Sequence, residues 1–217
     1  MSNDKITIPK TYLFVLMILG WFALISQLYL IIQNGTGTVA EIIIRYFSFF
    51  TILTNLIVVL CSSILFFKST AGNREGFFYK PSTLTAITVY ITIVGVVYNA
   101  ILRFLWQPKG LQYITDELLH TVIPIMFILM WLLFVPKKGL KFTDAFTWLI
   151  YPFVYLIYIA IRGQVTGEYP YPFINADQLG YGKALINAGG LSLAFLGLSL
   201  FLIALGKFLS NKKNTTT

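Results

Sequence analysis

Long apolar stretches alternate with short polar segments along this chain of 217 residues. A membrane-spanning helix needs about 20 predominantly apolar residues, and six stretches come close to that length or exceed it. Glycine and proline fall between them, where helices end and neighbours turn back antiparallel. We predict an all-α integral membrane bundle with an N-terminal segment 1–11, a tail 207–217 and six transmembrane helices at 12–32, 42–67, 84–106, 118–135, 145–162 and 184–206.

Composition indicates that lipid, not water, surrounds this bundle. Hydrophobic residues make up 57% of the chain and charged residues 11%, against about 25% charge in soluble domains. Because these few charged groups cannot cover the surface of a water-soluble protein, the outer surface must be largely apolar and face lipid. One histidine and one cysteine exclude a multi-histidine or cysteine-rich metal site and an intramolecular disulfide. We expect no metal and no cofactor.

Membrane topology explains the net charge of +8. Basic residues are scattered between apolar stretches and form no aromatic-interleaved patch, so we expect no nucleic-acid partner. Lysine and arginine are retained on the cytoplasmic side of a membrane, and eleven of the sixteen fall in alternate connections and the two terminal segments. We therefore predict that both termini are cytoplasmic and that the protein lies in the cell membrane. The eleven are Lys5, Lys10, Lys68, Arg74, Lys80, Lys137, Lys138, Lys141, Lys207, Lys212 and Lys213.

Polar side chains inside the predicted helices form one layer. Such groups are costly in lipid and usually face the bundle interior. At a rise of about 1.5 Å per residue, the alternating helix directions bring them together in the outer half of the membrane. We predict a cavity there that opens outward or sideways to the outer leaflet. The layer consists of Thr51, Asn55, Asn99, Arg103, His120 and Arg162.

A hydroxyl and an imidazole in this layer are the minimal unit of nucleophilic acyl transfer, with a third group orienting the ring. Thr51 or Thr54 is the candidate nucleophile, His120 the base, and Glu117 or Asp116 the orienting group. Each type of residue also has a structural interpretation: threonine bonds a carbonyl one turn earlier, arginine extends toward lipid headgroups, and asparagine links helices. The candidates for holding a developing oxyanion are Asn55, Asn99, Arg103 and Arg162, and these four with Glu117 are the candidate substrate-binding residues.

Three segments resemble a known family. They are Phe-Thr-Ile-Leu-Thr-Asn-Leu at 50–56, His-Thr-Val-Ile-Pro at 120–124, and Thr-Gly-Glu-Tyr-Pro-Tyr-Pro-Phe at 166–173. They resemble segments of the androgen-induced and androgen-dependent TFPI-regulating membrane proteins, which are multi-pass hydrolases of fatty-acid esters of hydroxy fatty acids, and of their microbial relatives. The resemblance implies an intramembrane threonine nucleophile at Thr51, a histidine base at His120 and a lipid ester substrate. It also favours a position beside the cavity for the loop 163–173.

Two alternatives to an esterase stay open at this point. Thr51 precedes Asn55 by four residues, one more than the eukaryotic pattern has between its threonine and its acid, so Thr54 remains a rival nucleophile. A non-catalytic lipid- or solute-binding protein or transporter would use Arg103, Arg162 and His120 for an anionic headgroup. A structural membrane protein would use the polar layer only for packing. Membrane lipids are the expected partners in every case, and the oligomeric state is left open.

Overall fold

The computed structural model describes residues 6–72, 74–105 and 107–214, and within these ranges it is helical without a strand. Six helices or joined helices are long and apolar enough to cross a membrane, which confirms the predicted helical fold and its six spans. Two residues used in the sequence analysis, Lys5 and Trp106, lie outside the described ranges. The six are α1 (Lys10–Asn34), α3 (Phe50–Thr70), α4 with η2 (Pro81–Phe104), α5 to α6 (Leu111–Phe134), α7 to α8 (Asp144–Thr166) and α10 (Tyr181–Asn214).

Three of the spans consist of more than one element. They are α4 (Pro81–Ala100) with η2 (Leu102–Phe104); α5 (Leu111–Glu117) with η3 (Leu118–Val122) and α6 (Ile123–Phe134); and α7 (Asp144–Trp148) with α8 (Ile150–Thr166). The connections contain the short helices α2 (Val39–Phe47), η1 (Phe77–Tyr79), η4 (Pro172–Ile174) and α9 (Ala176–Leu179). α10 continues to Asn214, past the predicted helix end at 206.

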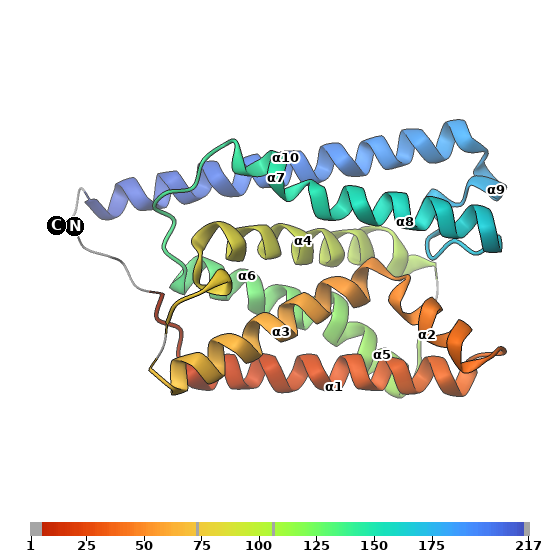
Figure 1. The fold of residues 1–217 in the computed structure, drawn as a ribbon, viewed down its shortest axis with the longest axis horizontal. Helices are drawn as coiled ribbons and strands as arrows, with labels where there is room; N and C mark the ends of the chain where they lie inside the picture. Colours follow the sequence, from red (N-terminus) through yellow and green to blue (C-terminus); the bar gives the residue numbers. More distant parts are fainter. Residues whose placement is uncertain (1–5, 73, 106, 215–217) are drawn as a thin grey trace.

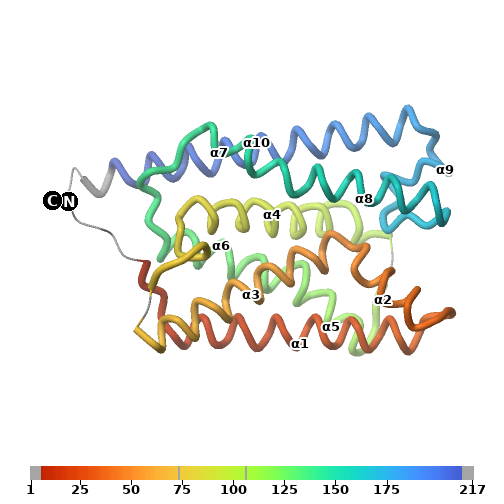
Figure 2. Tube along the Cα trace, viewed as in Figure 1, coloured from red at the N-terminus to blue at the C-terminus, as the bar shows by residue number. Residues whose placement is uncertain are grey.

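The helices run up and down as an antiparallel bundle with α4 at its centre. α4 packs against α3, α6 and α10, and it lies between α1 and α3 on one side and α8 and α10 on the other (Figures 1 and 2). α1 begins and α10 ends at the same end of the bundle, which we call the terminal end; α2, α5 and α9 lie at the opposite, distal end (Figure 1). The described chain therefore starts and finishes on one side.

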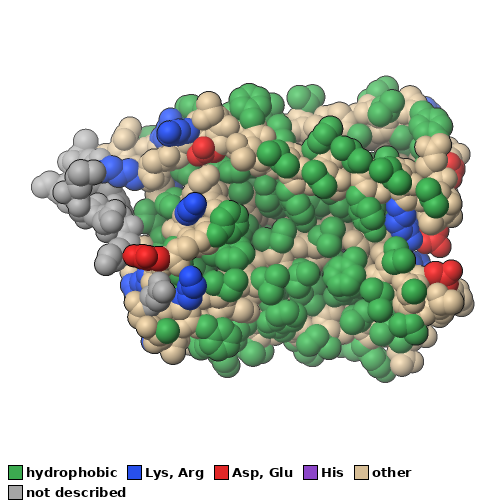
Figure 3. Space-filling model, viewed as in Figure 1, with side chains coloured by type: hydrophobic (Ala, Val, Ile, Leu, Met, Phe, Trp, Pro, Cys, Tyr) green, Lys and Arg blue, Asp and Glu red, His purple; other side chains and the backbone are tan. Residues whose placement is uncertain are grey.

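The outer surface of the bundle is apolar between its two ends. Apolar side chains cover the middle of the face in Figure 3, and charged side chains gather at the ends. Large residues such as Ile25, Phe153, Leu193 and Phe201 are exposed on α1, α8 and α10. A contiguous apolar belt with charged rims is the surface expected of a protein whose middle faces lipid.

The second predicted helix, 42–67, is wrong as one helix, because the chain breaks after Phe47 and starts again at Phe50. α2 begins with a capping box, in which the Thr38 hydroxyl accepts from the Glu41 N–H and the Glu41 carboxylate accepts from the Thr38 N–H. Those hydrogen bonds lower the pKa of Glu41. The break has no glycine or proline to mark it, and it moves Thr51 from a helix interior to the first turn of α3.

Tyrosine hydroxyls from α8 and the following loop occupy the break. Tyr155 donates to the Ser48 carbonyl at 2.8 Å and accepts from the Phe50 N–H at 3.2 Å. The first N–H groups of a helix have no partner within the helix, so this tyrosine supplies what a capping side chain normally does. The start of α3 is therefore fixed by residues about 100 positions later in the chain.

Candidate functional site

A cavity of about 600 Å³ lies at the distal end, where α1, the α2–α3 break, α5 with η3, and the loop after α8 meet. Both residues that the sequence nominated for catalysis, Thr51 and His120, line it. Its wall also includes Arg45, Asp116 and Tyr171. Its lining residues place the cavity at the end of the bundle opposite to the start of α1 and the end of α10. Of the six residues in the predicted polar layer, Thr51 and His120 line it.

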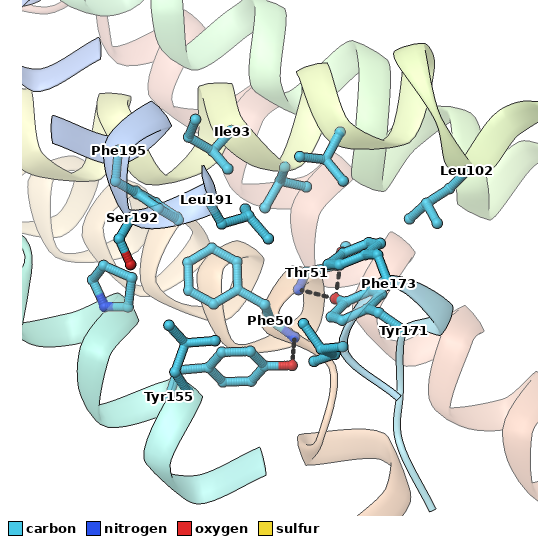
Figure 4. A pocket seen from close by; sticks show the side chains of 15 residues that line it. Phe50, Thr51, Ile93, Leu102, Tyr155, Tyr171, Phe173, Leu191, Ser192 and Phe195 are labelled. Atoms are coloured by element: carbon cyan, nitrogen blue, oxygen red, sulfur yellow. Dashed lines mark hydrogen bonds between the residues drawn. The ribbon is translucent and has the colours of Figure 1, made fainter. Parts of the chain in front are cut away.

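Thr51 is held in the first turn of α3, where its own N–H has no partner within the helix. The Tyr171 hydroxyl fills that role: it lies 3.3 Å from the Thr51 nitrogen and 3.4 Å from the Thr51 Oγ1 (Figure 4). Thr51 is 8% exposed. The nucleophile candidate, a backbone N–H and a phenol hydroxyl thus meet at one point, at the positive end of a helix.

Thr54, the rival threonine, is in a different environment one turn further along α3. Its hydroxyl lies 3.1 Å from the Tyr151 hydroxyl, and the residue is completely buried. Among the described residues, Thr54 lines neither the large cavity nor the apolar pocket that adjoins it. A substrate in either space meets Thr51 first.

His120 lies in a π-helical turn, η3, that interrupts the fourth span. Its Nδ1 is 2.9 Å from the Asp116 carbonyl oxygen, and a carbonyl oxygen only accepts, so Nδ1 carries the hydrogen. In the neutral ring, Nε2 then has a free lone pair. Tyr98 stacks on the imidazole with centroids 3.9 Å apart and planes 12° apart. The ring is oriented by a backbone carbonyl and an aromatic face, not by the Glu117 or Asp116 carboxylate.

Proline accounts for part of this local geometry. Pro124 has no N–H, so the His120 carbonyl four residues earlier loses its α-helical donor. Asn99 on α4 replaces that donor, with its Nδ2 3.2 Å from the His120 oxygen. Gly95 allows the approach, because a Cβ there would lie 3.2 Å from the same oxygen and 3.2 Å from the Pro124 ring. π-helical turns of this kind recur at functional sites.

Both asparagines nominated from the sequence link helices through backbone carbonyls. Asn55 Nδ2 donates to the Thr51 carbonyl at 2.9 Å and to the Leu119 carbonyl at 3.1 Å. Asn99 Nδ2 reaches the Gly95 and His120 carbonyls and the Thr121 hydroxyl. Their amide hydrogens are occupied, so they position Thr51 and the His120 turn relative to each other. Neither lines the cavity among the described residues.

The two arginines and the glutamate nominated for substrate binding form ion pairs away from the cavity wall. Arg103 pairs with Glu117 at 2.5 Å and also donates to the Thr121 hydroxyl at 3.1 Å. Arg162 pairs with Glu168 at 2.6 Å. Of the described residues, the cavity wall includes Arg45 but not these three. Arg103, Glu117 and Arg162 therefore lie at the expected end of the bundle without facing the expected cavity.

Asp116 is a buried carboxylate in the cavity wall, 4% exposed. Its Oδ1 accepts from Gln112 at 3.0 Å, and the same amide nitrogen donates to Gln27 on α1. Its Oδ2 is buried and has no hydrogen-bond partner among the described residues. The described residues hold no group of three or more histidine, cysteine, aspartate and glutamate side chains suited to a metal ion.

Tyr171 is a residue of the site that the sequence did not nominate for catalysis. Burial raises the pKa of its hydroxyl, so Tyr171 stays a neutral phenol at pH 7 and can donate a hydrogen bond. Its neighbours Pro170 and Pro172 line the cavity as well, which confirms the expected position of the loop 163–173. The Tyr-Pro-Phe end of that loop was the available signal, but nothing in the sequence connected it to Thr51.

A second, apolar pocket of about 60 Å³ adjoins Thr51 on its other side, between α3, α4, α8 and α10 (Figure 4). Thr51, Tyr171 and Leu102 line both spaces. Thr51 therefore stands between a large, partly polar cavity that contains His120 and a small apolar pocket that does not.

Comparisons of the chain with protein-family models, with curated proteins and with solved structures gave no match. The function of the site is therefore inferred from its own geometry and from the chemistry of its residues.

Proposed function

We propose that the protein is an integral membrane hydrolase that cleaves a lipid acyl ester, with Thr51 as nucleophile and His120 as general base. The observation that carries this proposal is the shared cavity: Thr51 and His120, from α3 and η3, line one space at the distal end. A nucleophile and a base that open onto one substrate-sized cavity are the first requirement of covalent acyl transfer. The three segments that resemble the androgen-induced family include both residues.

The chemistry follows from these two side chains. Thr51 Oγ1 bonds to the acyl carbon as its proton passes to His120 Nε2, and the carbonyl electrons move onto oxygen. The bond from the acyl carbon to the alcohol oxygen then breaks, and that oxygen takes the proton from His120. Water attacks the acyl-threonine, giving one proton through His120 to Thr51 Oγ1 as the carboxylic acid leaves. Thr51 and His120 do not hydrogen-bond each other in the described structure, so the substrate or a water molecule brings them into register.

One hydrogen-bond donor, the Tyr171 hydroxyl, lies where the oxyanion would form. Its oxygen accepts from the Thr51 N–H at 3.3 Å and lies 3.4 Å from the Thr51 Oγ1. Tyr171 would turn its hydrogen from the Thr51 hydroxyl to the new oxyanion as that oxygen becomes negative. We assign this role to Tyr171 in place of Asn55, Asn99, Arg103 and Arg162, whose donors are occupied or lie off the cavity wall.

The non-catalytic alternative has less support. An anionic headgroup held by Arg103, Arg162 and His120 needs free guanidinium groups facing the cavity. Arg103 and Arg162 are instead neutralised by Glu117 and Glu168. No observation specific to transport or to headgroup binding by these residues favours that function over hydrolysis.

Labelling by a fluorophosphonate probe tests the threonine mechanism, because such probes react with activated hydroxyl nucleophiles. We expect the purified wild-type protein to be labelled and to hydrolyse a fluorogenic acyl ester. Thr51→Ala should lose both, with hydrolysis falling by about 10⁴-fold or more. Thr54→Ala is the matched control, one turn away on the same helix, and should retain both. Labelling or turnover that survives Thr51→Ala would rule out the proposed nucleophile, and unchanged turnover in His120→Gln would rule out the proposed base.

We also infer that the terminal end faces the cytoplasm and that the distal cavity opens outside the cell membrane. The support is the distribution of basic residues along the sequence, where eleven of sixteen fall in the terminal segments and the connections predicted to be cytoplasmic. Cys61 is buried, so its replacement by alanine gives a background for introduced cysteines. In intact cells, a membrane-impermeant maleimide should label Lys109→Cys and leave Lys138→Cys unlabelled. The reverse pattern would invert the topology.

A further inference from the structure

The two spaces that meet at Thr51 differ tenfold in volume. The large cavity measures about 600 Å³ and contains His120, whereas the apolar pocket measures about 60 Å³ and does not. Thr51 and Tyr171 line both the cavity and the pocket. An ester attacked at Thr51 must therefore extend one of its two halves into each space.

The position of His120 determines which of the two spaces holds the alcohol half of the ester and which holds the acyl half. In the proposed reaction, the alcohol oxygen leaves by taking a proton from His120, so that oxygen must face the histidine. His120 lines the large cavity only, among the described residues of the two walls. The alcohol half then lies in the large cavity, and the acyl half points the other way, into the apolar pocket.

Four large side chains form a buried part of the pocket wall. Phe50, Ile93, Tyr155 and Phe195 are each no more than 8% exposed. The Phe50 ring packs on the Tyr155 ring with centroids 5.0 Å apart and on the Phe195 ring at 5.6 Å. Figure 4 shows the Phe195 and Phe50 rings on the side of the pocket away from Leu102. Close-packed interiors resist expansion by even one methylene group.

We propose that the apolar pocket binds the acyl group of the ester and that this group is short, two to four carbons long. The inference rests on the proposed hydrolase function. A dry cavity of about 150 Å³ holds one benzene molecule of six carbons, so a pocket of about 60 Å³ holds roughly half as many. The lipid character of the substrate then resides in its alcohol half, which has the large cavity available to it.

A chain-length series tests the size of the acyl group directly. The purified full-length protein is assayed with 4-methylumbelliferyl acetate, butyrate, octanoate and palmitate, with Thr51→Ala subtracted as the blank. We expect kcat/KM to be highest for acetate or butyrate and to fall at least tenfold at octanoate, because one surplus methylene alone costs about tenfold in a hydrophobic pocket that fits its ligand. A maximum at octanoate or palmitate would overturn the short-acyl proposal and leave the threonine hydrolase intact. No hydrolysis above the Thr51→Ala blank for any ester would instead overturn the hydrolase itself, and the acyl pocket with it.

Two substitutions on α10 change the pocket in opposite directions. Ser192 lines the pocket, and Ser192→Leu should lower the butyrate to acetate turnover ratio about tenfold or more. Phe195→Ala should raise the octanoate to butyrate ratio about tenfold by extending the pocket. Phe201 is 59% exposed on the same helix, so Phe201→Ala is the control and should keep the wild-type profile. A chain-length profile that none of these variants alters would remove the acyl group from this pocket, and Ser192→Leu keeps the test valid if Phe195→Ala does not fold.

Discussion

The two ends of the bundle use charge in different ways. At the terminal end, cationic side chains bind helix carbonyls and aromatic rings: Lys137 donates to the Trp131 carbonyl at 2.6 Å, and Lys207 lies 4.2 Å from the centre of the Phe142 ring. At the distal end, Arg103 and Arg162 are each paired with a glutamate. Basic residues at the end of a helix complement its dipole and remain positive, whereas the distal pairs neutralise one another.

This difference separates topology from chemistry. The positive charge of the terminal end is the kind of signal that fixes orientation in a membrane. At the distal end, the groups closest to Thr51 are uncharged: the Tyr171 hydroxyl and the N–H groups of the first turn of α3. Positively charged side chains are therefore concentrated at the end that we expect to fix the membrane orientation, and neutral hydrogen-bonding groups surround the residue at which we expect the reaction.

The largest effect is expected from Tyr171→Phe at the distal end. This change removes one oxyanion donor beside Thr51 and should lower kcat for ester hydrolysis by about 10²-fold with little change in KM. Tyr79→Phe is the control at the terminal end, where the Tyr79 hydroxyl donates to the Leu65 carbonyl at 3.2 Å, and its rate should match the wild type. Steady-state kinetics of both variants decide the matter: equal rates would leave Tyr171 with a purely structural role at the start of α3.

Gly95→Ala should have the next largest effect, on both stability and rate. The added methyl group meets the His120 carbonyl and the Pro124 ring at 3.2 Å each, and neither a backbone oxygen nor a proline ring yields easily. We expect a loss of about 1–3 kcal/mol in the free energy of unfolding and roughly tenfold in kcat/KM, as the His120 turn shifts.

Gly197→Ala on α10 is the control for that substitution, because a Cβ at Gly197 meets nothing within 4 Å. Unfolding in mixed micelles and the ester assay should both give wild-type values for it. If Gly95→Ala behaved like Gly197→Ala, the close approach of α4 to η3 would not be what positions His120.

The sequence predicted the spans and the two central residues of the site because both depend on local pattern. Apolar length identifies a membrane helix, and a lone histidine within one is rare enough to nominate. Thr51 was nominated by the resemblance that the segment 50–56 carries. Helix direction then assigned Thr51 and His120 to one depth. The structure brings both to one cavity wall, although the second span begins at Phe50 and not at 42.

The residues that the sequence could not assign owe their roles to contacts made across the fold. Tyr171 lies 120 positions from Thr51, and Arg103 meets Glu117 across neighbouring helices. The helix break before Phe50 depends on Tyr155, 105 positions later, in place of a local glycine or proline. Polarity alone also could not separate arginines that face a cavity from arginines that pair with an acid, which is why Arg103 and Arg162 were nominated for substrate binding.

Alkaline pH should destabilise the distal end through Tyr46. Burial raises the pKa of Tyr46 to about 12, above its ordinary value of about 10. Between these values the folded protein holds a proton that the unfolded chain has lost, so the free energy of unfolding is unaffected below pH of about 10 and falls above it. We expect the wild type to lose about 2 kcal/mol more than Tyr46→Phe between pH of about 10 and 12. Unfolding curves at several pH values measure that difference, and parallel curves would contradict it.

The smallest effect is expected from breaking an ion pair at the distal end. Glu117→Gln leaves Arg103 without its carboxylate, but the pair is partly exposed, with 38% and 23% of the two side chains accessible. We expect the thermal midpoint to fall by about 1–4 °C and ester hydrolysis to stay within threefold, because neither residue lines the cavity. Lys207→Gln at the terminal end should likewise leave the rate unchanged. A tenfold loss of activity in Glu117→Gln alone would show that Glu117 and Arg103 contribute to the substrate site. It would contradict the interpretation that the charged pairs of the distal end take no part in the reaction.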